Sequence, residues 1–358
     1  MKKNSADYTI YFLVNDSNVG DNLTAHAIAH GLKDNLGNTY DVTKITEDNL
    51  KFISDLIEDN DIVVGAGLHN LFILTELNAF TIWSCHQLPD VDIDFINNID
   101  LVALPKHAFY RSTSDVITTN LLETFGVAHS RRAEDIIQAY SDSTIKRNGC
   151  YDFLILGGDA PEENGTMKYF SAKAAISITN YVSNHRDQNS HLLLTNSHRT
   201  GKHNPSTGNI IEYGSEIDNI SKECLANIMG IEHDFFNARS ATNNYPALLG
   251  AIITHAESRI YIPGESISMI SEALSLFPME NIFIYETDSM SGSHYAHLKS
   301  ILDRYPVNYL KLGDEYTLTP VRESASDSAK YNACDDIVKN AFNILKERQD
   351  QLSTGFSI

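Results

Sequence analysis

The feature that most constrains the fold of this chain is an alternation of short apolar runs with longer segments of helical periodicity. In the first half, amphipathic stretches at 21–36 and 69–77 separate such runs, and 116–120 is a further candidate strand. The apolar runs are 8–14, 61–67, 80–85 and 100–105. Short strands that alternate with helices are typical of a parallel sheet with crossover helices, so the first half predicts an α/β domain.

The same alternation restarts after a polar, glycine-containing stretch at 141–150. Apolar runs at 151–159, 191–197, 259–264 and 281–286 alternate with segments of helical character at 167–183, 216–229, 245–255 and from Ser266 onward. We therefore expect two tandem Rossmann-like domains, residues 1–148 and 149–320, with a cleft between them. In the terminal region 321–358, residues 328–349 predict one amphipathic helix.

Acidic residues outnumber basic residues in this sequence by 47 to 27, which gives its 358 residues a formal net charge of −20. A charge of this sign opposes non-specific binding to nucleic acid and to anionic lipid surfaces, so neither is an expected partner. Any anionic ligand must then meet a local positive site.

Signals for export, membrane insertion or metal binding are weak. The run at 8–14 is short and bounded by polar residues, which favours a strand over a signal peptide, and no window approaches the roughly 18 apolar residues of a transmembrane helix. The four cysteines form no CxxC pair, and His26 and His30 share a helical face without an HExxH pattern. We expect a cytoplasmic protein without a bound metal.

Two strand-end loops of the second half have the composition of phosphate sites. Gly157 and Gly158 follow a buried strand and precede a helix, so their backbone can approach a phosphate, although such pairs also make plain turns. The loop at 195–202 carries hydroxyls, Ser197 among them, together with Arg199 and a lysine. Arginine can bind a phosphate bidentately, and the alternative is a solvated polar loop.

Two helix starts add to this set. Asn244 precedes a helix that it could cap. In YIPGESISMISEAL, 261–274, Ser266 either caps the helix or joins Ser268 in facing an anion, with Glu272 one turn further on the same side. A glycine-rich loop, a basic loop and a serine-bearing helix start together indicate a diphosphate and ribose site, as a nucleotide-sugar donor requires. No GxxxxGK[ST] pattern occurs, which excludes a P-loop.

The order of the segments GGD, LLLTNSHRT, NNYPALLGAIITHAES and ESISMISEAL resembles the Elm-type mitochondrial fission family, a plant and bacterial group that looks like GT-B glycosyltransferases. The similarity covers most of 151–300. The positions that match the family's motifs are Gly157, Gly158, Ser197, Arg199, Asn244, Ser266, Ser268, Ser271 and Glu272, and Gly264 lies in the turn that begins the last motif.

In the first half the resemblance is thinner. The family's first strand ends in a loop with glycine and histidine, and here that loop keeps Gly20 and has no histidine. DLVALPKH resembles the family's DLVVVPxHD, so His107 matches, while Ala108 stands where the family has aspartate. Asp16, Asp21 and His107 are the weak candidates for a general base. The structural alternative, which their residue types favour, is a helix cap or a solvated carboxylate for the aspartates and a packing residue for the histidine.

The GT-B likeness implies a division of roles between the domains. The second domain holds the nucleoside diphosphate, Glu272 binds the ribose, the first domain brings the acceptor, and the C-terminal helix packs back on the first domain. Arg199 and backbone N–H groups meet the leaving-group charge without a metal. The DxD sequences at 90–92 and 92–94 lie far from the donor motifs, which argues against a metal-dependent GT-A enzyme.

The function predicted from the sequence is a glycosyltransferase that uses a nucleotide-sugar donor and no cofactor. The acceptor is unknown, and a glycan or a lipid-linked glycan is a class that the sequence leaves open. One alternative is a non-catalytic GT-B-like scaffold or regulatory protein. A second is a nucleotide-sugar epimerase of the same architecture.

Overall fold

The structure is a computed structural model that describes residues 9–15, 19–36, 41–109, 117, 120–145, 149–162, 165–211, 214, 216–321, 327 and 329–354. The chain forms two compact units. Unit 1 comprises residues 1–130 and 332–358, and unit 2 comprises 131–331.

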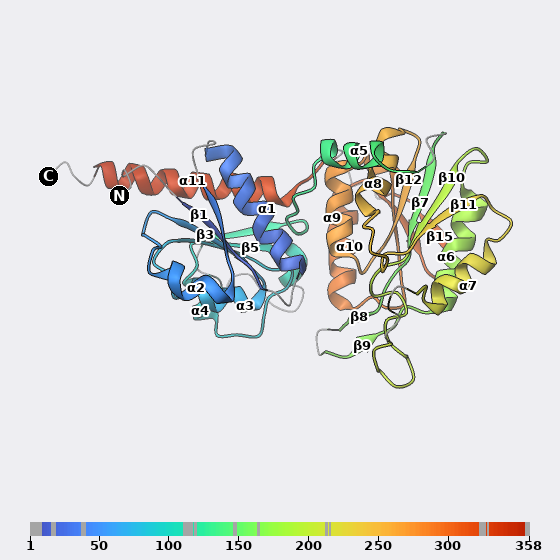
Figure 1. Ribbon diagram of the computed structural model, residues 1–358, viewed down its shortest axis with the longest axis horizontal. Helices are drawn as coiled ribbons and strands as arrows, with labels where there is room; N and C mark the ends of the chain where they lie inside the picture. The colour runs from blue at the N-terminus through green and yellow to red at the C-terminus, as the bar shows by residue number, and fades with distance from the viewer. Residues whose placement is uncertain are drawn as a thin grey trace. The chain divides into compact units, whose positions relative to one another are not determined.

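Unit 1 is built on a six-stranded sheet in which every described pairing is parallel, in the order β2-β1-β3-β4-β5-β6. The strands are β1 (Ile10–Leu13), β2 (Val42–Ile45), β3 (Ile62–Ala66), β4 (Phe80–Ser84), β5 (Leu101–Pro105) and β6 (Asn120–Thr124). Helices α1 (Val19–Leu36) and α11 (Ala333–Thr354) pack on one face, and α2 (Glu47–Ser54), α3 (Gly67–Leu74) and α4 (Ile93–Asn97) on the other (Figure 1). The four inner strands, β1, β3, β4 and β5, are buried along their whole length and mostly apolar, because both faces of the sheet are covered.

Helix α11 returns to unit 1 and packs along α1. A Cβ at Gly31 would lie 2.9 Å from Val338 Cγ2, so the missing side chain lets the two helices approach closely. The Cys334 thiol donates to the Ala27 carbonyl at 3.3 Å, and Ile337 is buried in the same cluster. The prediction that the C-terminal helix packs on the N-terminal domain is confirmed.

Unit 2 contains a seven-stranded sheet in the order β11-β10-β7-β12-β13-β14-β15, parallel except for the last pair. Its strands are β7 (Tyr151–Ile155), β10 (His191–Thr195), β11 (His233–Phe236), β12 (Arg259–Pro263), β13 (Ile282–Tyr285), β14 (Asn308–Lys311) and β15 (Thr317–Thr319). A separate small hairpin joins β8 (Ala160–Pro161) and β9 (Met167–Lys168). Counted within the unit, the first six large strands have the order 3-2-1-4-5-6, which is that of a dinucleotide-binding Rossmann sheet.

The helices of unit 2 lie on both faces of this sheet (Figure 1). They are α5 (Ala133–Ser141), α6 (Ala172–His185), α7 (Asn219–Asn227), α8 (Tyr245–Thr254), α9 (Ile267–Leu276) and α10 (Gly292–Arg304). Two short 3-10 helices, η1 (Lys106–Phe109) in unit 1 and η3 (Met279–Asn281) in unit 2, complete the elements used here. The predicted fold class, α/β with two tandem Rossmann-like domains, is confirmed.

The division between the units differs from the expected boundary at 148/149. Helix α5 packs on α8 within unit 2, where an added Cβ at Gly250 would lie 2.0 Å from the Ile136 carbonyl oxygen. Residues 131–148 therefore group with unit 2. The polar stretch at 141–150 marks a loop, and a loop signal by itself does not say on which side a domain ends.

Several element bounds also differ from expectation. The helix expected from 167 begins at Ala172, because Met167 and Lys168 form β9. The strand expected at 116–120 is β6, which begins at Asn120, and most of the expected span lies outside the described residues. Within the described part of the chain, no helix is both long and apolar enough to cross a membrane.

Candidate functional site

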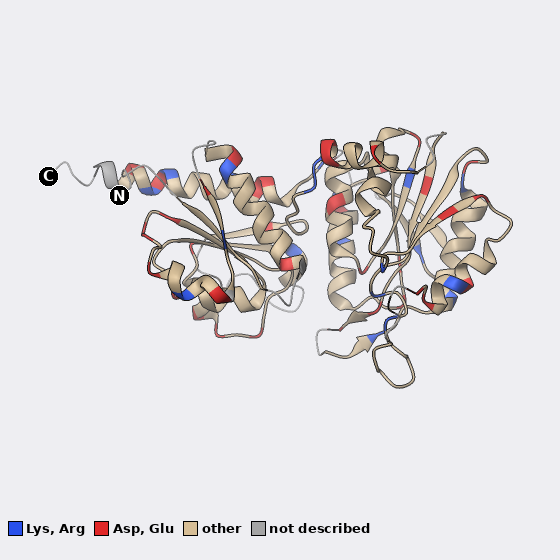
Figure 2. Ribbon diagram, in the orientation of Figure 1, with Lys and Arg blue, Asp and Glu red and all other residues tan. Residues whose placement is uncertain are grey.

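The candidate site lies at the carboxyl edge of the unit 2 sheet, where four neighbouring strands end. Strands β10, β7, β12 and β13 are adjacent in the sheet and parallel, so the loops that follow them leave the same edge. The order reverses between β7 and β12, and ligands of open α/β sheets bind at such a switch point. Lys and Arg are scattered along the ribbon of this unit rather than gathered in one stretch (Figure 2).

Glu265 joins three of these strand ends. Its Oε1 accepts a hydrogen bond from the Gly158 amide at 2.8 Å, and its Oε2 accepts one from the Thr287 hydroxyl at 2.7 Å. The residue is only 3% exposed. Burial raises the pKa of this carboxyl, and the hydrogen bonds from Thr287 and Gly158 and the charge of Arg199 oppose that rise. Glu265 is a site residue that was not predicted, although its place directly after a buried strand was a usable signal.

Glycines allow the strand-end loops to touch. A Cβ at Gly158 would lie 2.7 Å from Arg199 Cβ and 2.8 Å from Ser197 Oγ. A Cβ at Gly157 would lie 2.9 Å from the Phe170 ring. The two predicted glycines are therefore required by close approach of a neighbouring loop, which also leaves their backbone uncovered by side chains of their own. A glycine is required at position 264 for the same reason, because an added Cβ would lie 2.7 Å from a methionine sulfur.

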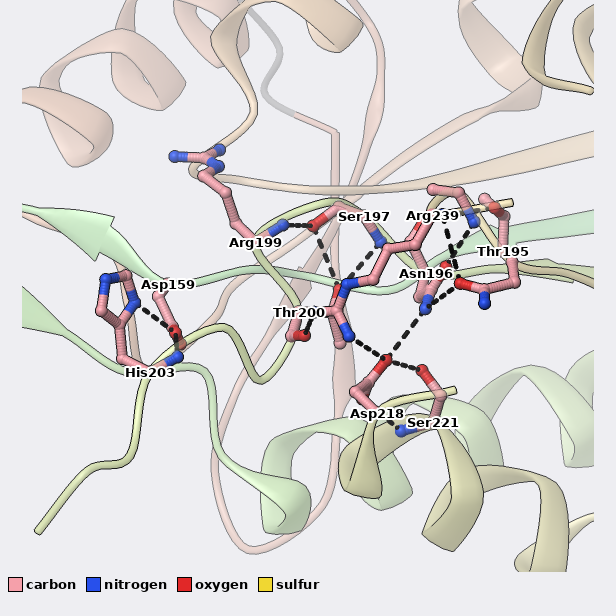
Figure 3. Close-up of polar contacts among 12 residues, drawn as sticks. Asp159, Thr195, Asn196, Ser197, Arg199, Thr200, His203, Asp218, Ser221 and Arg239 are labelled. Atoms are coloured by element: carbon pink, nitrogen blue, oxygen red, sulfur yellow. Dashed lines mark hydrogen bonds and ion pairs between the residues drawn. The ribbon is translucent and has the colours of Figure 1, made fainter. Parts of the chain in front are cut away.

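The loop after β10 is tied to the glycine loop by hydroxyl contacts. Thr200 Oγ1 donates to the Gly157 carbonyl at 2.6 Å and accepts from the Ser197 amide at 2.9 Å. Ser197 Oγ accepts from the Arg199 amide at 3.2 Å. Figure 3 shows the Arg199 guanidinium directed away from these contacts. Among the described residues no hydrogen bond or ion pair of this guanidinium is found, while its charge acts on the nearby Glu265 carboxyl. A half-buried cation at this edge suits an anionic ligand.

A buried network of polar side chains supports the loop after β10. Asp218 caps α7 by accepting from the Ser221 amide at 2.8 Å, and it also accepts from Asn196 Nδ2 at 2.9 Å. Arg239 forms an ion pair with Asp218 at 3.8 Å and donates to the Thr200 carbonyl. The contacts are drawn in Figure 3. A buried network of this kind holds the backbone of the loop in place.

The residue after the glycine pair, Asp159, forms a second buried contact. Asp159 Oδ2 accepts from both the backbone amide and Nδ1 of His203, each at 2.9 Å, and Oδ1 accepts from the Phe170 amide at 3.0 Å. The side chain of Asp159 is 1% exposed and that of His203 is 12% exposed. Neither residue was selected from the sequence as a site residue.

The start of α9 leaves its backbone N–H groups without a side-chain cap. Ser266 occupies the N-cap position, but its hydroxyl makes no capping hydrogen bond. Ser268 is exposed, while the Ser271 hydroxyl donates to the Ile267 carbonyl at 2.8 Å. Unsatisfied N–H groups at a helix start, together with the helix dipole, favour a bound anion.

Glu272 lies in a different environment from Glu265. Its Oε2 forms an ion pair with Arg131 Nε at 2.9 Å, and its side chain is 13% exposed. Burial raises the pKa of this carboxyl, and the Arg131 charge opposes the rise. The Arg131 guanidinium also lies over the Tyr245 ring, 5.0 Å from its centroid. Asn244 stands at the N-cap of α8 without a side-chain capping bond.

The three base candidates of unit 1 are placed in three different ways. Asp16 lies outside the described residues. Asp21, in the first turn of α1, lies against Gly67, whose φ of 76° and missing Cβ make room for the carboxylate. His107 is 3% exposed within η1. In the described part of the chain, no group of three or more His, Cys, Asp or Glu residues is arranged to hold a metal ion.

Comparison with known proteins gives matches only among solved structures. No protein-family model and no curated protein matches the chain. An E. coli structure described as trehalose-6-phosphate bound with UDP-2-fluoro glucose matches with a TM-score of 0.45 and 9% identity, over 96% of this chain and 98% of the other. The alpha,alpha-trehalose 6-phosphate synthase of Burkholderia multivorans gives 0.42 and 10%, over 95% and 93%.

The alpha,alpha-trehalose-phosphate synthase (UDP-forming) of Burkholderia vietnamiensis gives a TM-score of 0.43 and 9% identity, over 95% of both chains. Similarity at this level assigns no activity. The expected membership of the Elm-type mitochondrial fission family is not shown by any of these comparisons. Each unit contains a largely parallel, Rossmann-like sheet, and the C-terminal helix returns to unit 1, as the sequence led us to expect.

Proposed function

We propose that unit 2 binds the diphosphate of a nucleotide-sugar donor and that the chain is a glycosyltransferase of GT-B type. The observation that carries the proposal is the meeting of three strand ends through Gly158, Glu265 and Thr287, beside the half-buried guanidinium of Arg199. The start of α9, whose N-cap Ser266 directly follows Glu265, adds uncapped N–H groups at the same edge.

The chemistry of this edge suits a diphosphate. Arg199 supplies a planar, permanently charged donor, and backbone amides supply further hydrogen bonds without adding negative charge. In a chain with a net charge of −20, such a local donor set is what an anionic ligand needs. We propose that Arg199 and the α9 N–H groups stabilise the leaving nucleoside diphosphate, so that no metal is needed for this step.

Glu272 is proposed to bind the ribose. A carboxylate accepts hydrogen bonds, and the 2′ and 3′ hydroxyls of ribose are donors. Its ion pair with Arg131 opposes the rise in pKa that burial causes, and a carboxylate has lone pairs left for a sugar. Glu272→Gln is expected to weaken binding of a nucleoside diphosphate by about 1.5 to 3 kcal/mol and to leave binding of the 2′,3′-dideoxy analogue unchanged. Equal losses for both compounds, measured by calorimetry, would refute the ribose contact.

Unit 1 is proposed to bring the acceptor, for which a glycan or a lipid-linked glycan remains the class to test. Asp16, Asp21 and His107 stay the candidates for the base that activates it. Cytoplasmic nucleotide sugars would supply the donor, which is consistent with the proposed location of the protein in that compartment.

The first test removes the cation of the site. Arg199→Ala is expected to weaken nucleoside diphosphate binding by about 1.5 to 3 kcal/mol, as for loss of a charge-assisted hydrogen bond. Lys222→Ala is the matched control, because it removes one positive charge from an exposed position of α7. If both variants bind with the affinity of the parent chain, Arg199 does not contact the ligand.

A second test measures turnover with a panel of nucleotide sugars that differ in base and sugar. Release of nucleoside diphosphate in the presence of a metal chelator is expected with one donor of the panel. Binding without turnover would favour the scaffold or regulatory protein, and release of an altered free sugar would favour the epimerase.

A further inference from the structure

The Asp159 and His203 pair lies beside the proposed diphosphate site and has not been assigned a role so far. Asp159 directly follows Gly158, and its own amide donates to the Arg199 carbonyl at 3.1 Å. The Lys202 amide donates to the same carbonyl at 3.2 Å, which closes a turn from Arg199 toward His203. The imidazole and the guanidinium therefore belong to one turn that is fastened to the glycine loop (Figure 3).

The contacts of Asp159 decide which imidazole nitrogen is available. An ionised carboxylate only accepts hydrogen bonds, so the 2.9 Å contact with Oδ2 places a hydrogen on His203 Nδ1. The second 2.9 Å bond, from the His203 backbone amide to the same oxygen, fixes the ring relative to its own backbone. Nε2 is the nitrogen left for a ligand. A doubly protonated ring can donate to Asp159 and to an anion at the same time.

We propose that His203 Nε2 is a second side-chain donor to the diphosphate of the ligand, next to Arg199, and that Asp159 is the positioning residue that orients the ring. The inference rests on the proposed function and adds a specific contact to it. It predicts that the site distinguishes a diphosphate from an uncharged nucleoside through the His203 ring as well as through Arg199.

The simpler alternative is that the pair only holds the turn between Arg199 and His203. Two amide substitutions separate these roles, because each carries an N–H where one imidazole nitrogen lies. His203→Asn keeps a donor near the position of Nδ1, so it can still hold Asp159, and has nothing at Nε2. His203→Gln places a donor near the position of Nε2.

The experiment measures binding of a nucleoside diphosphate and of the parent nucleoside to the full chain by calorimetry. His203→Asn is expected to lower diphosphate affinity about tenfold, the loss of one hydrogen bond to a charged group, and to leave nucleoside affinity unchanged. His203→Gln is expected to keep diphosphate affinity within about threefold of the parent, since it keeps an N–H donor near the position of Nε2. His198→Asn, at an exposed position of the same loop, is the control and should bind as the parent does.

If His203→Asn binds the diphosphate as tightly as the parent chain does, the inference is overturned. The proposed function still stands in that case if Arg199→Ala loses affinity. Failure of the parent chain to bind any nucleoside diphosphate removes the proposed function and the inference together. If His203→Asn melts at a lower temperature than the parent, His203→Gln is compared with His203→Leu, which has no donor. Tighter diphosphate binding by His203→Gln than by His203→Leu then supports the contact between His203 and the diphosphate, and equal binding by the two variants overturns it.

Discussion

The carboxyl edges of the two sheets differ in how their strand ends are joined. In unit 2, the ends of β7, β12 and β13 are linked through side chains, with Glu265 accepting from both Gly158 and Thr287. In unit 1, β3 passes directly into α3 at Gly67, and β5 passes directly into η1. An edge with loops between strand and helix has room for side chains and amides around a ligand, while direct transitions leave less room.

At the carboxyl edge of each sheet a carboxylate lies against a glycine, but the two carboxylates come from different positions in the fold. Asp21 of unit 1 stands at the start of its own helix and approaches Gly67, which has a positive φ. Glu265 of unit 2 follows a neighbouring strand and accepts from Gly158. The first arrangement is a close approach that a residue with a Cβ would block, whereas the second is a hydrogen bond that joins two loops of a candidate site. This difference is the reason why the donor site is proposed in unit 2.

The largest expected effect tests how the units are divided. Gly250→Ala should destabilise unit 2 by about 3 kcal/mol, because the new methyl would meet the Ile136 carbonyl oxygen at 2.0 Å and no side-chain rotation can relieve that contact. Hydrogen exchange should show lost protection in α5 and α8 and unchanged protection in β1 and β3.

Gly230→Ala is the control for this substitution, because an added Cβ there meets nothing within 4 Å. It should change stability by no more than about 0.5 kcal/mol. Equal stability of Gly250→Ala and Gly230→Ala would mean that α5 does not pack on α8 as described, and the boundary at 130/131 would have to move.

The next effect tests whether the joined loops of unit 2 form the ligand site. Gly158→Ala should lower stability by about 1 to 3 kcal/mol, because its Cβ would crowd Arg199 and Ser197. It should also weaken nucleoside diphosphate binding more than tenfold, since Arg199 moves with the loop. Gly67→Ala disturbs the corresponding edge of unit 1 and should leave nucleotide affinity unchanged. If Gly67→Ala is the variant that loses nucleotide affinity, the edge of unit 2 is not the nucleotide site.

The smallest expected effect concerns how stability depends on pH. Burial raises the pKa of Glu265 above its ordinary value of 4.5, so the folded state favours the protonated carboxyl. The corresponding stability is present below about pH 4.5 and is lost as the pH rises through the raised pKa. Glu265→Gln stays neutral, so the unfolding free energy of the parent should fall relative to that of the variant as pH increases.

Urea unfolding over a pH series measures this difference. Glu223→Gln, at an exposed position of α7, is the control and should show a difference from the parent that does not change with pH. A parent chain that gains stability over Glu265→Gln as pH increases would show that the Glu265 carboxylate is stabilised rather than penalised at its site.

The strands that could be predicted from the sequence are those buried on both faces. The apolar runs that became β7, β10 and β12 lie inside the unit 2 sheet, where both sides of a strand need apolar residues. The strands that were not predicted include β2 and β11, which lie at sheet edges and are mostly half-buried. Because an edge strand faces solvent along one side, its residues need not be apolar, and the periodic signal is lost.

The candidate site was predictable at the level of loops. Gly157, Arg199 and Ser266 all lie at strand ends of the unit 2 sheet, as the runs before them indicated. Glu265 was not predicted, because it accepts from an amide 107 positions away. Asp159 was not predicted for the same reason, since its partner His203 is 44 positions away. The ion pair between Glu272 and Arg131 was not predicted either, because the two residues are far apart in the sequence.

The sequence by itself determined that this chain forms two α/β sheets and that one edge of the second carries glycines, hydroxyls and an arginine. Local periodicity is sufficient for this, because the apolar residues of a buried strand or helix face recur at short, regular spacings along the sequence. Only the tertiary structure decided which carboxylate accepts from the Gly158 amide and which one pairs with Arg131. It also decided that α5 belongs to unit 2. These contacts depend on sheet order and helix packing, which bring together residues that no local pattern connects.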